Sequence, residues 1–380
     1  MFEKIWRASL APLIAAASAI IISSIALLIS GNDPVEAFRE MWKTIDSTQS
    51  VVIILNVSVP YYISGVAAAI GFKMNLFNIG TNGQYLLAAL IAGWAGAEVS
   101  LPPLLHVPFV ILVAITVGGT WALIAGILNV TRNVNVVVST IMLNYIAIGV
   151  SAFLLAEFFR DNSTGGLVAN TKLMPESARL PALNPIFEFF GFDFPENVEL
   201  FGFLPIAILI GVIYYVLLNR SLFGYELKLS GLNPAAALAA GVNPKKMVLI
   251  TLFLSGAVAG MIGLPFLLSD PSFLKYGDAF PTMIGFTGLG LALLGRNHPV
   301  GIAAAAIVWA TIERATQRLG PIGIPPEIGK ILQGSFLLSA VIAYEVVRRR
   351  NDAAAVAAAA AATHHENPPP IEPSPIGATS

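Results

Sequence analysis

Two stretches of polar and glycine residues interrupt long apolar runs of the sequence. The first, KMNLFNIGTNGQ at 73–84, brings several amide side chains close together along the chain. The second, PTMIGFTGLG at 281–290, combines threonines and a phenylalanine with glycines. Amides and hydroxyls hydrogen-bond to uncharged polar molecules, and aromatic rings stack on them, without any formal charge. The chemistry indicated is recognition of a neutral polar solute rather than bond cleavage.

We predict that the solute passes along polar and aromatic residues of these stretches and of two further apolar runs. The predicted pathway residues are Tyr61, Asn75, Asn78, Asn82, Gln84, Asn144, Tyr145, Phe286 and Thr287. Structural roles compete with this interpretation. The amides at 75–84 can satisfy backbone groups that a helix break leaves free, and those at 144–145 can hold neighbouring helices together. Tyr61 can belong to an interfacial aromatic belt, although the adjacent Pro60 favours a pathway.

The rest of the sequence offers no catalytic or metal-binding pattern. The chain has no cysteine, its four histidines are scattered, and it lacks the GxxxxGK[ST] loop that binds nucleotide phosphates. We therefore predict no enzymatic activity, no metal and no cofactor in this chain.

The composition places the chain in a lipid bilayer. Hydrophobic residues make up 56% of its 380 residues and charged residues only 11%, whereas an average soluble domain is about 25% charged. The formal net charge of −1 excludes the basic surface that nucleic acid binding needs. We predict an all-α polytopic membrane protein.

Apolar runs of about 17 to 25 residues, enough to cross roughly 30 Å of hydrocarbon, recur along the chain. We expect about ten spans, at 8–30, 51–72, 82–99, 106–130, 135–157, 200–218, 247–269, 280–295, 299–312 and 330–347. The first is longer than the apolar core of a secretory signal, so we interpret it as a retained span. No ionisable side chain lies in the middle of any of these runs, which argues against proton coupling but leaves sodium coupling open.

These spans form a predicted transmembrane domain over 1–350. The alanine- and proline-rich segment 351–380 has a composition that need not fold, and we expect a disordered cytoplasmic tail. An even number of spans puts both termini on one side of the membrane. The closing RRR at 348–350 and the short basic loops place that side in the cytoplasm.

The two interrupted stretches fall at matching places in the two halves of the chain. Spans two to five and seven to ten would then run in opposite directions. This arrangement predicts two inverted repeats, with broken or re-entrant helices around a central site. A third pattern is structural, because Gly256, Gly260 and Gly263 have the small-residue spacing that lets helices pack closely.

The inner loop 219–246 contains a predicted short helix. Asn233 can cap it, Pro234 can begin it, and Gly241 can end it. Such a helix can lie on the membrane surface or dock into a partner. The segment lacks Lys and Arg and is weakly amphipathic, which favours docking. The outer loop 158–199 is rich in proline, asparagine and acids, and could receive another partner.

Four motifs together resemble the permease subunits of bacterial ABC importers for simple sugars, branched-chain amino acids and nucleosides. The motifs are LFNIGTNGQ at 76–84, TIMLNY at 140–145, GLNPAAALAAGVNP at 231–244 and GLGLALLGRNHP at 288–299. The resemblance covers about 50–345 and is closest to the nucleoside branch, whose importers depend on a basic membrane lipoprotein. Relatives commonly carry an acid where Asn82 stands, and the tail lies outside the pattern.

The resemblance implies a core of two permeases, with two cytoplasmic ATP-binding cassette subunits that bind the ATP and an external substrate-binding lipoprotein. We expect the second permease to be a paralogue. The resemblance also implies that the short helix is the ATPase coupling helix. Its predicted residues are Gly231, Asn233, Pro234, Ala236, Ala237 and Gly241.

The sequence therefore predicts a transport subunit of the bacterial inner membrane that moves a small neutral solute, most of all a nucleoside, into the cytoplasm. Alternatives are a permease for simple sugars or branched-chain amino acids, an ion-coupled secondary carrier, and a structural or channel-like membrane subunit.

Overall fold

The computed structural model describes residues 17–163, 168–195, 197–325 and 327–339, together with Ile342, Val346 and Arg349. Among these residues the regular structure is helical apart from one isolated bridge between Asn170 and Gly277, so the all-α prediction is confirmed. Residues 8–16 of the first expected span and the tail 351–380 lie outside the described residues.

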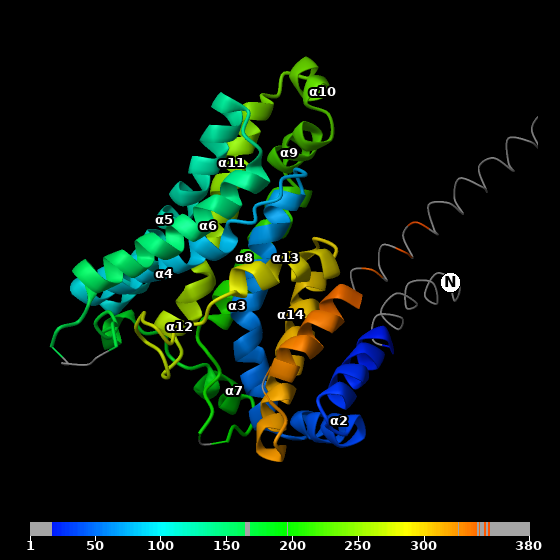
Figure 1. Cartoon of the computed structure of the whole chain (residues 1–380). Helices are drawn as coiled ribbons and strands as arrows, with labels where there is room; N and C mark the ends of the chain where they lie inside the picture. The colour runs from blue at the N-terminus through cyan, green and yellow to red at the C-terminus, as the bar shows by residue number, and fades with distance from the viewer. Residues whose placement is uncertain are drawn as a thin grey trace, which may run out of the picture.

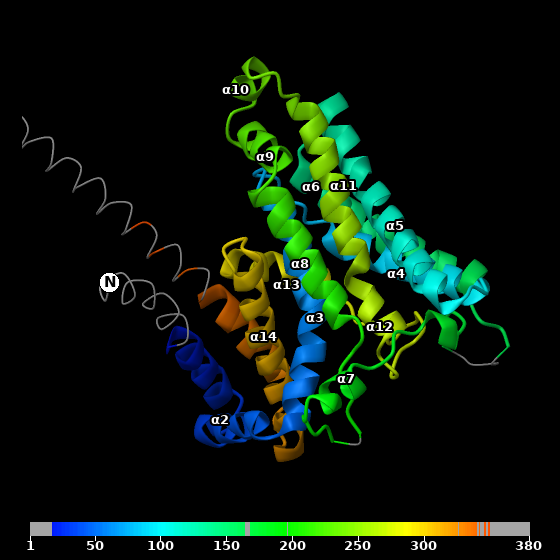
Figure 2. The ribbon, with the colours of Figure 1, turned by 180° about the vertical axis from the view of Figure 1, so that it is seen from behind.

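The helices follow one another along the chain, as Figures 1 and 2 show from opposite sides. In chain order they are a helix over Ala17–Ile29, α2 (Pro34–Trp42), η1 (Lys43–Asp46), α3 (Thr48–Phe72), α4 (Thr81–Glu98), α5 (Pro103–Arg132), α6 (Val136–Leu154), η2 (Leu155–Phe159), η3 (Glu176–Ala178), α7 (Asn184–Phe189), α8 (Leu204–Asn219), α9 (Leu222–Leu232), α10 (Pro234–Ala239), α11 (Pro244–Gly260), η4 (Met261–Gly263), α12 (Leu264–Leu268), α13 (Ile284–Leu294), α14 (Pro299–Thr316), η5 (Gln317–Ile322) and a helix over 327–339.

Four helical segments of the described chain are long and apolar enough to cross a membrane by themselves. They are Thr48–Phe72, Pro103–Arg132, Val136–Phe159 and Pro244–Leu268, and each begins and ends within a few residues of an expected span. A fifth span results if Leu204–Asn219 and Leu222–Leu232, which meet at a bend of 67°, are taken together. More than five spans would require shorter helices, such as α13, to cross the membrane as well.

Three expected boundaries need correction. The run 280–295 becomes helical only at Ile284, because Met283 has a left-handed backbone with φ of 70°. The run 299–312 continues as helix to Thr316 and so takes Glu313 into α14. The loop 219–246 holds two helices rather than one: Ser221 caps the additional helix α9 by accepting a hydrogen bond from Gly224 N.

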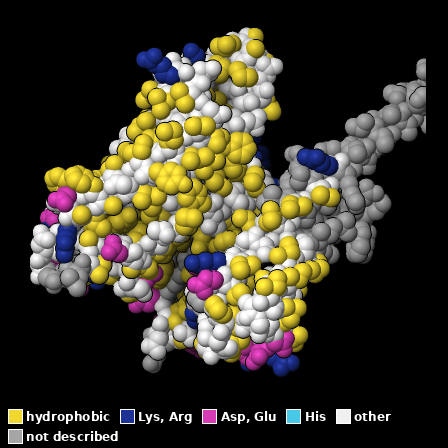
Figure 3. Space-filling model, in the orientation of Figure 1, with side chains coloured by type: hydrophobic (Ala, Val, Ile, Leu, Met, Phe, Trp, Pro, Cys, Tyr) yellow, Lys and Arg dark blue, Asp and Glu magenta, His cyan; other side chains and the backbone are white. Residues whose placement is uncertain are grey.

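Helix α3 lies at the centre of the bundle, in contact with α8, α11, α13 and α14, while α4, α5 and α6 pack to one side (Figure 1). Most of its side chains are buried. Figure 3 shows apolar side chains over much of one face of the molecule, with Asp and Glu only in the half away from α10. This distribution suits a chain whose middle lies in lipid.

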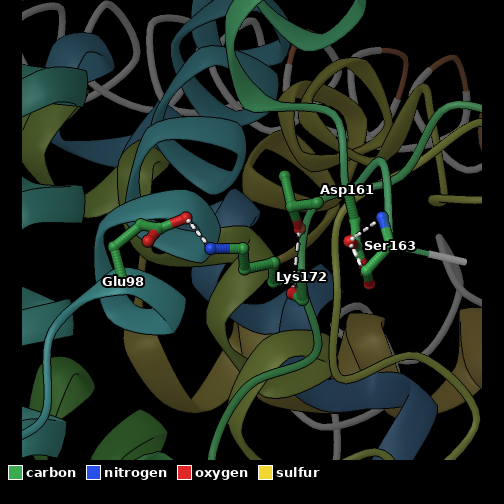
Figure 4. A network of polar contacts seen from close by, with 5 residues as sticks. Glu98, Asp161, Ser163 and Lys172 are labelled. Atoms are coloured by element: carbon green, nitrogen blue, oxygen red, sulfur yellow. Dashed lines mark hydrogen bonds and ion pairs between the residues drawn. The ribbon is translucent and has the colours of Figure 1, made fainter.

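The loop 158–199 is tied to the segment between α12 and α13 and to the end of α4. Thr171 N donates to the Tyr276 carbonyl at 2.9 Å, and Met174 N donates to the Leu274 carbonyl at 2.8 Å. Lys172 pairs with Glu98 at the end of α4, with 2.7 Å between Nζ and Oε1 (Figure 4). This hydrogen bond raises the pKa of Lys172. The pair is exposed, so the backbone bonds contribute more than the charges to holding the loop.

Glycines form a close seam between α5 and α11. A Cβ on Gly118 would lie 2.8 Å from the Cα of Gly260, and a Cβ on Gly256 would overlap Ala122 and the Gly118 carbonyl. The predicted packing role of Gly256 and Gly260 is therefore confirmed, with α5 as the partner. Gly263 instead faces Ala89 and Tyr85 of α4.

This seam predicts a large difference between two glycine substitutions. Gly256→Ala should destabilise the protein by about 1–3 kcal/mol, because the added methyl group overpacks the helix contact. Gly149→Ala in α6 is the matched control, since nothing lies within 4 Å of its added Cβ. Thermal unfolding of the purified protein in detergent measures both. Equal unfolding midpoints for the two variants would contradict the close packing of this seam.

Candidate functional site

The two interrupted stretches meet inside the molecule. The Thr81 hydroxyl at the start of α4 donates to the Gly285 carbonyl of α13 at 2.8 Å. The Ser64 hydroxyl of α3 donates to the Ile284 carbonyl at 2.9 Å. A Cβ on Gly285 would lie 2.5 Å from the Asn82 nitrogen, so only glycine allows this approach. We call these five residues the helix junction.

Local sequence explains why both helices begin at the junction. Helix α3 ends in a turn in which Asn75 takes a left-handed backbone with φ of 56°, and α4 restarts after Gly80. Helix α13 restarts after Pro281, whose carbonyl accepts a hydrogen bond from the Tyr85 hydroxyl. Neither α4 nor α13 has a capping side chain of its own. The first N–H groups of both helices therefore depend on other partners.

Asn144 of α6 supplies a cap for α4 from another helix. Its Oδ1 accepts from Gly83 N at 2.7 Å, and its Nδ2 donates to the Ile79 carbonyl at 2.7 Å. Both polar atoms of this buried amide are committed to backbone groups that the break leaves free. The structure thus supports the interhelical role for Asn144.

Asn78 and Gln84 pair with each other. The Asn78 Nδ2 donates to the Gln84 Oε1 at 3.0 Å, and the Gln84 Nε2 donates back to the Asn78 Oδ1 at 3.0 Å. Asn78 also donates to the Ser255 hydroxyl at 2.9 Å, which in turn donates to the Ala67 carbonyl. These two amides brace the break between α3 and α4.

Asn82 differs from the other amides of this region. Its side chain is 1% exposed, and its Oδ1 has no hydrogen-bond partner among the described residues. Leaving a buried acceptor unpaired costs about 1–3 kcal/mol, so a hydrogen-bond donor placed beside this oxygen would recover that free energy. Phe286 and Thr287, on the first turn of α13, are half-buried beside the junction.

The structure does not bring the remaining predicted residues to the junction. Asn75 is exposed and donates to the Gly231 carbonyl at 3.0 Å. Tyr145 is 74% exposed on the outer side of α6, because successive residues of a helix point about 100° apart. Tyr145 therefore lies on a different face of α6 from the buried Asn144, and its place on the pathway stays a prediction.

Tyr61 lies one turn before Ser64 on α3 and faces α14. Its ring meets the ring of Trp309 edge-on, with 6.1 Å between centroids. The sequence placed Glu313 beyond the end of a span, whereas the structure gives it a half-buried position inside α14. The buried Oε2 of Glu313 has no hydrogen-bond partner among the described residues.

Sequence reasoning missed the hydroxyls that hold the junction together. Ser64, Thr81 and Ser255 are all fully buried and bonded to backbone or amide groups of other helices. One signal was available for Ser64, which lies one turn after Tyr61 and so shares its helix face. The roles of Thr81 and Ser255 depend on which helices become neighbours in the fold, and the order of helices along the chain does not show this.

The predicted short helix is present as α10. Asn233 Oδ1 accepts from Ala236 N at 3.0 Å, Pro234 is the first residue, and Gly241 has a left-handed φ of 81° just after its end. The helix stands away from the bundle (Figures 1 and 2). Of its side chains, Ala237 is buried and Leu238 is 63% exposed.

Gly231 connects α10 to the break between α3 and α4. A Cβ on Gly231 would lie 2.7 Å from the Cα of Met74, and the Gly231 carbonyl holds the Asn75 side chain. The Thr251 hydroxyl of α11 also contacts the Met74 sulfur at 3.2 Å. The segment that carries α10 therefore touches the turn that leads to the junction.

Comparison with known proteins identifies the family. Residues 50–341 match the family model described as branched-chain amino acid transport system / permease component. The chain belongs to this family. It is accordingly a multi-pass membrane protein, the permease of an ABC importer and a transport subunit rather than an enzyme.

Several members with known roles are similar over most of their length. The chain is 30% identical to the guanosine ABC transporter permease protein NupP of Bacillus subtilis, over 89% of this chain and 94% of NupP. It is 29% identical to the nucleoside ABC transporter permease protein NupB of Lactococcus lactis, over 89% of this chain and 92% of NupB. It is also 29% identical to the glucose ABC transporter permease protein TsgB13 of Haloferax volcanii, over 88% and 87% of the two chains.

A second guanosine permease of Bacillus subtilis, NupQ, is 24% identical over 66% of this chain and 76% of NupQ. A solved inward-facing structure described as a metal-chelate type ABC transporter covers 90% of this chain and 97% of its own, with 18% identity and a TM-score of 0.41.

The hydrogen bonds at the junction predict opposite results for two amides of the permease. Asn144→Ala should destabilise it by about 1–3 kcal/mol, because the Gly83 N–H and the Ile79 carbonyl lose their partner. Asn82→Ala should leave its stability nearly unchanged, since the Asn82 Oδ1 has no protein partner to lose. Thermal unfolding in detergent compares the two. A larger loss of stability for Asn82→Ala than for Asn144→Ala would show that the bonds of the junction are assigned incorrectly.

Proposed function

We propose that this permease imports a nucleoside, and that the solute is recognised at the helix junction. The observation that carries the proposal is the unpaired, buried Oδ1 of Asn82 between the first turns of α4 and α13. A neutral solute with N–H or O–H donors satisfies this oxygen, whereas a bare anion is repelled by it. The aromatic Phe286 and the hydroxyl of Thr287 beside it suit a nucleobase and a sugar.

The helix beginnings add to this recognition. The first turn of a helix carries unpaired N–H groups and a partial positive charge, and broken helices of transporters turn such ends toward the polar groups of their substrates. Hydroxyl and carbonyl oxygens of a nucleoside can accept from these N–H groups while its donors reach Asn82. The names of NupP and NupB support a nucleoside as the solute.

We assign coupling to the segment that carries α10. Its exposed Leu238 and small alanines fit a cleft on a cytoplasmic ATP-binding cassette subunit. When ATP closes that subunit, movement of α10 passes through the tight Gly231–Met74 contact to the turn before α4. The junction then opens to the other side of the membrane, as alternating access requires.

The proposal includes the topology and the partners that this mechanism needs. Residues 1–350 form a transmembrane domain of about ten spans with two inverted repeats. Both termini lie in the cytoplasm of a bacterial cell. The meeting of two broken helices from opposite halves of the chain supports the repeats. A paralogous second permease is supported by the match to both NupP and NupQ, and an external lipoprotein delivers the solute.

A simple sugar is the second candidate solute, because TsgB13 is named as a glucose permease. The remaining predicted pathway residues, Tyr61, Asn75 and Tyr145, lie away from the junction and are proposed only to border the route. A sugar and a nucleoside differ in the nucleobase, so competition experiments separate them. A branched-chain amino acid carries charges that the named junction residues do not match.

Asn82→Ala should lower solute uptake about tenfold or more, since a buried hydrogen bond to the solute is lost.

Uptake of radiolabelled guanosine is measured in cells with this gene deleted and then complemented, with adenosine, glucose and leucine as competitors. Deletion should abolish uptake and only adenosine should compete. Undiminished guanosine uptake after deletion would refute the proposed solute. Uptake in the complemented cells that collapses with an ionophore would favour an ion-coupled carrier.

Leu238→Asp should abolish uptake and prevent binding of the ATPase subunit, because a charge enters an apolar contact. Ile186→Asp on α7 is the matched control: Ile186 is 56% exposed and Leu238 is 63% exposed, and α7 lies at the other end of the molecule (Figure 1). Co-purification of the tagged permease with its ATPase measures binding. An ATPase that remains bound to Leu238→Asp permease would exclude α10 as the docking helix.

A further inference from the structure

A polar pocket opens at the end of α3 away from α10. Its volume is about 480 Å³, and it lies between α3, the loop 197–201 and the segment 266–272. The lining residues are Gln49, Ile53, Asn56, Val57, Asn197, Val198, Glu199, Phe201, Phe266, Asp270, Pro271 and Ser272. None of the predicted pathway residues is among them.

The wall of this pocket is fixed by two asparagines. Asn56 of α3 donates through Nδ2 to the Glu199 carbonyl at 2.7 Å and accepts from Phe201 N at 2.9 Å. Asn184 of α7 makes a similar pair of bonds, donating to the Val198 carbonyl and accepting from Leu200 N. A loop held in this way needs little ordering when a ligand binds, so the pocket is preformed.

The lining chemistry suits an uncharged solute rich in hydroxyl groups. The carboxylates of Glu199 and Asp270 accept hydrogen bonds, the amides of Gln49 and Asn197 both donate and accept, and Phe201 and Phe266 offer ring faces. Among the described residues, no lysine, arginine or histidine lines the pocket. Two acids without a cation repel phosphorylated solutes.

A second hollow of the described chain has the opposite character. It measures about 640 Å³, lies between α3, α8 and α14, and is lined almost wholly by apolar side chains. Hydrocarbon suits that hollow, and a polar solute does not. The polar pocket is also near the junction, because Asn56 precedes Ser64 by eight residues on α3, or about 12 Å of helix.

We propose that this polar pocket is an extracytoplasmic receiving site, where an uncharged hydroxyl-rich solute binds before it reaches the junction and from which phosphorylated forms are excluded. The proposal rests on the proposed function, because the import topology places the start of α3 on the outer side of the membrane.

The absence of cysteine from the natural chain permits a direct test with single cysteines. Asn197→Cys places a thiol in the pocket, and Ile186→Cys places an exposed thiol on α7 as the matched control. The complete transporter is tested in right-side-out vesicles with two membrane-impermeant methanethiosulfonates, one cationic and one anionic. Guanosine is then added as the protecting solute, with guanosine monophosphate as its phosphorylated counterpart.

Three results are expected. The cationic reagent should modify Asn197→Cys about threefold or more faster than the anionic reagent, because Glu199 and Asp270 attract it. When Glu199→Gln and Asp270→Asn are added, the ratio of the cationic to the anionic rate should fall to the ratio found for Ile186→Cys. Guanosine should slow modification of Asn197→Cys, whereas guanosine monophosphate should not. Modification at Asn197→Cys should block guanosine uptake.

Each failure has its own meaning. Modification that leaves guanosine uptake intact, or a rate that guanosine does not change, overturns the receiving site while uptake itself still supports the proposed function. Labelling of Asn197→Cys only in inside-out vesicles overturns the topology and the receiving site together. If deletion of the gene leaves guanosine uptake intact, the proposed function fails first. Glucose then replaces guanosine as the protecting solute, and a lack of protection by both overturns the receiving site.

Discussion

Lipid offers no hydrogen bonds, so every backbone group freed at a helix break inside the membrane must find a partner within the protein. This constraint explains the arrangement at the junction. Helices α4 and α13 begin there without capping side chains of their own. Asn144 caps α4 from a neighbouring helix, Thr81 and Ser64 bind carbonyls of α13, and the Asn78–Gln84 pair braces the turn before α4. Without these bonds the two breaks could not lie beside each other.

The same constraint narrows the search for a solute contact. A polar residue whose atoms are all bonded within the protein cannot exchange them for a solute without loss. Asn78, Gln84 and Asn144 are of this kind, while Asn82 keeps one buried oxygen unused. The family shows that the chain is a permease, and the unpaired atom is the basis on which we propose the helix junction as the place of recognition. The same argument applies to the polar pocket at the start of α3, whose acids and amides face an open volume and are available to a solute.

Much of the fold was predictable from the sequence, because apolar runs mark the long helices and Asn233, Pro234 and Gly241 mark the ends of α10. The pairing of side chains was less predictable from the sequence. Four amides of one stretch are alike in sequence, and only the folded chain shows that Asn75 reaches Gly231 while Asn78 reaches Gln84. Tyr145 follows Asn144 in sequence but lies on an exposed face of α6, because successive residues of a helix point in different directions. Glu313 was set outside a span because a charge usually ends an apolar run, whereas here the helix continues.

The glycine seam between α5 and α11 has a consequence for how the molecule can deform. Two helices whose backbones touch over several turns cannot slide or roll against each other without collision, so they behave as one rigid plate. Rigidity in that plate concentrates bending strain at the few places where helical bonds are already interrupted, namely the turn before α4, the bend between α8 and α9, and the start of α13. Those places then act as hinges, and the seam sets the fixed frame against which their angles change.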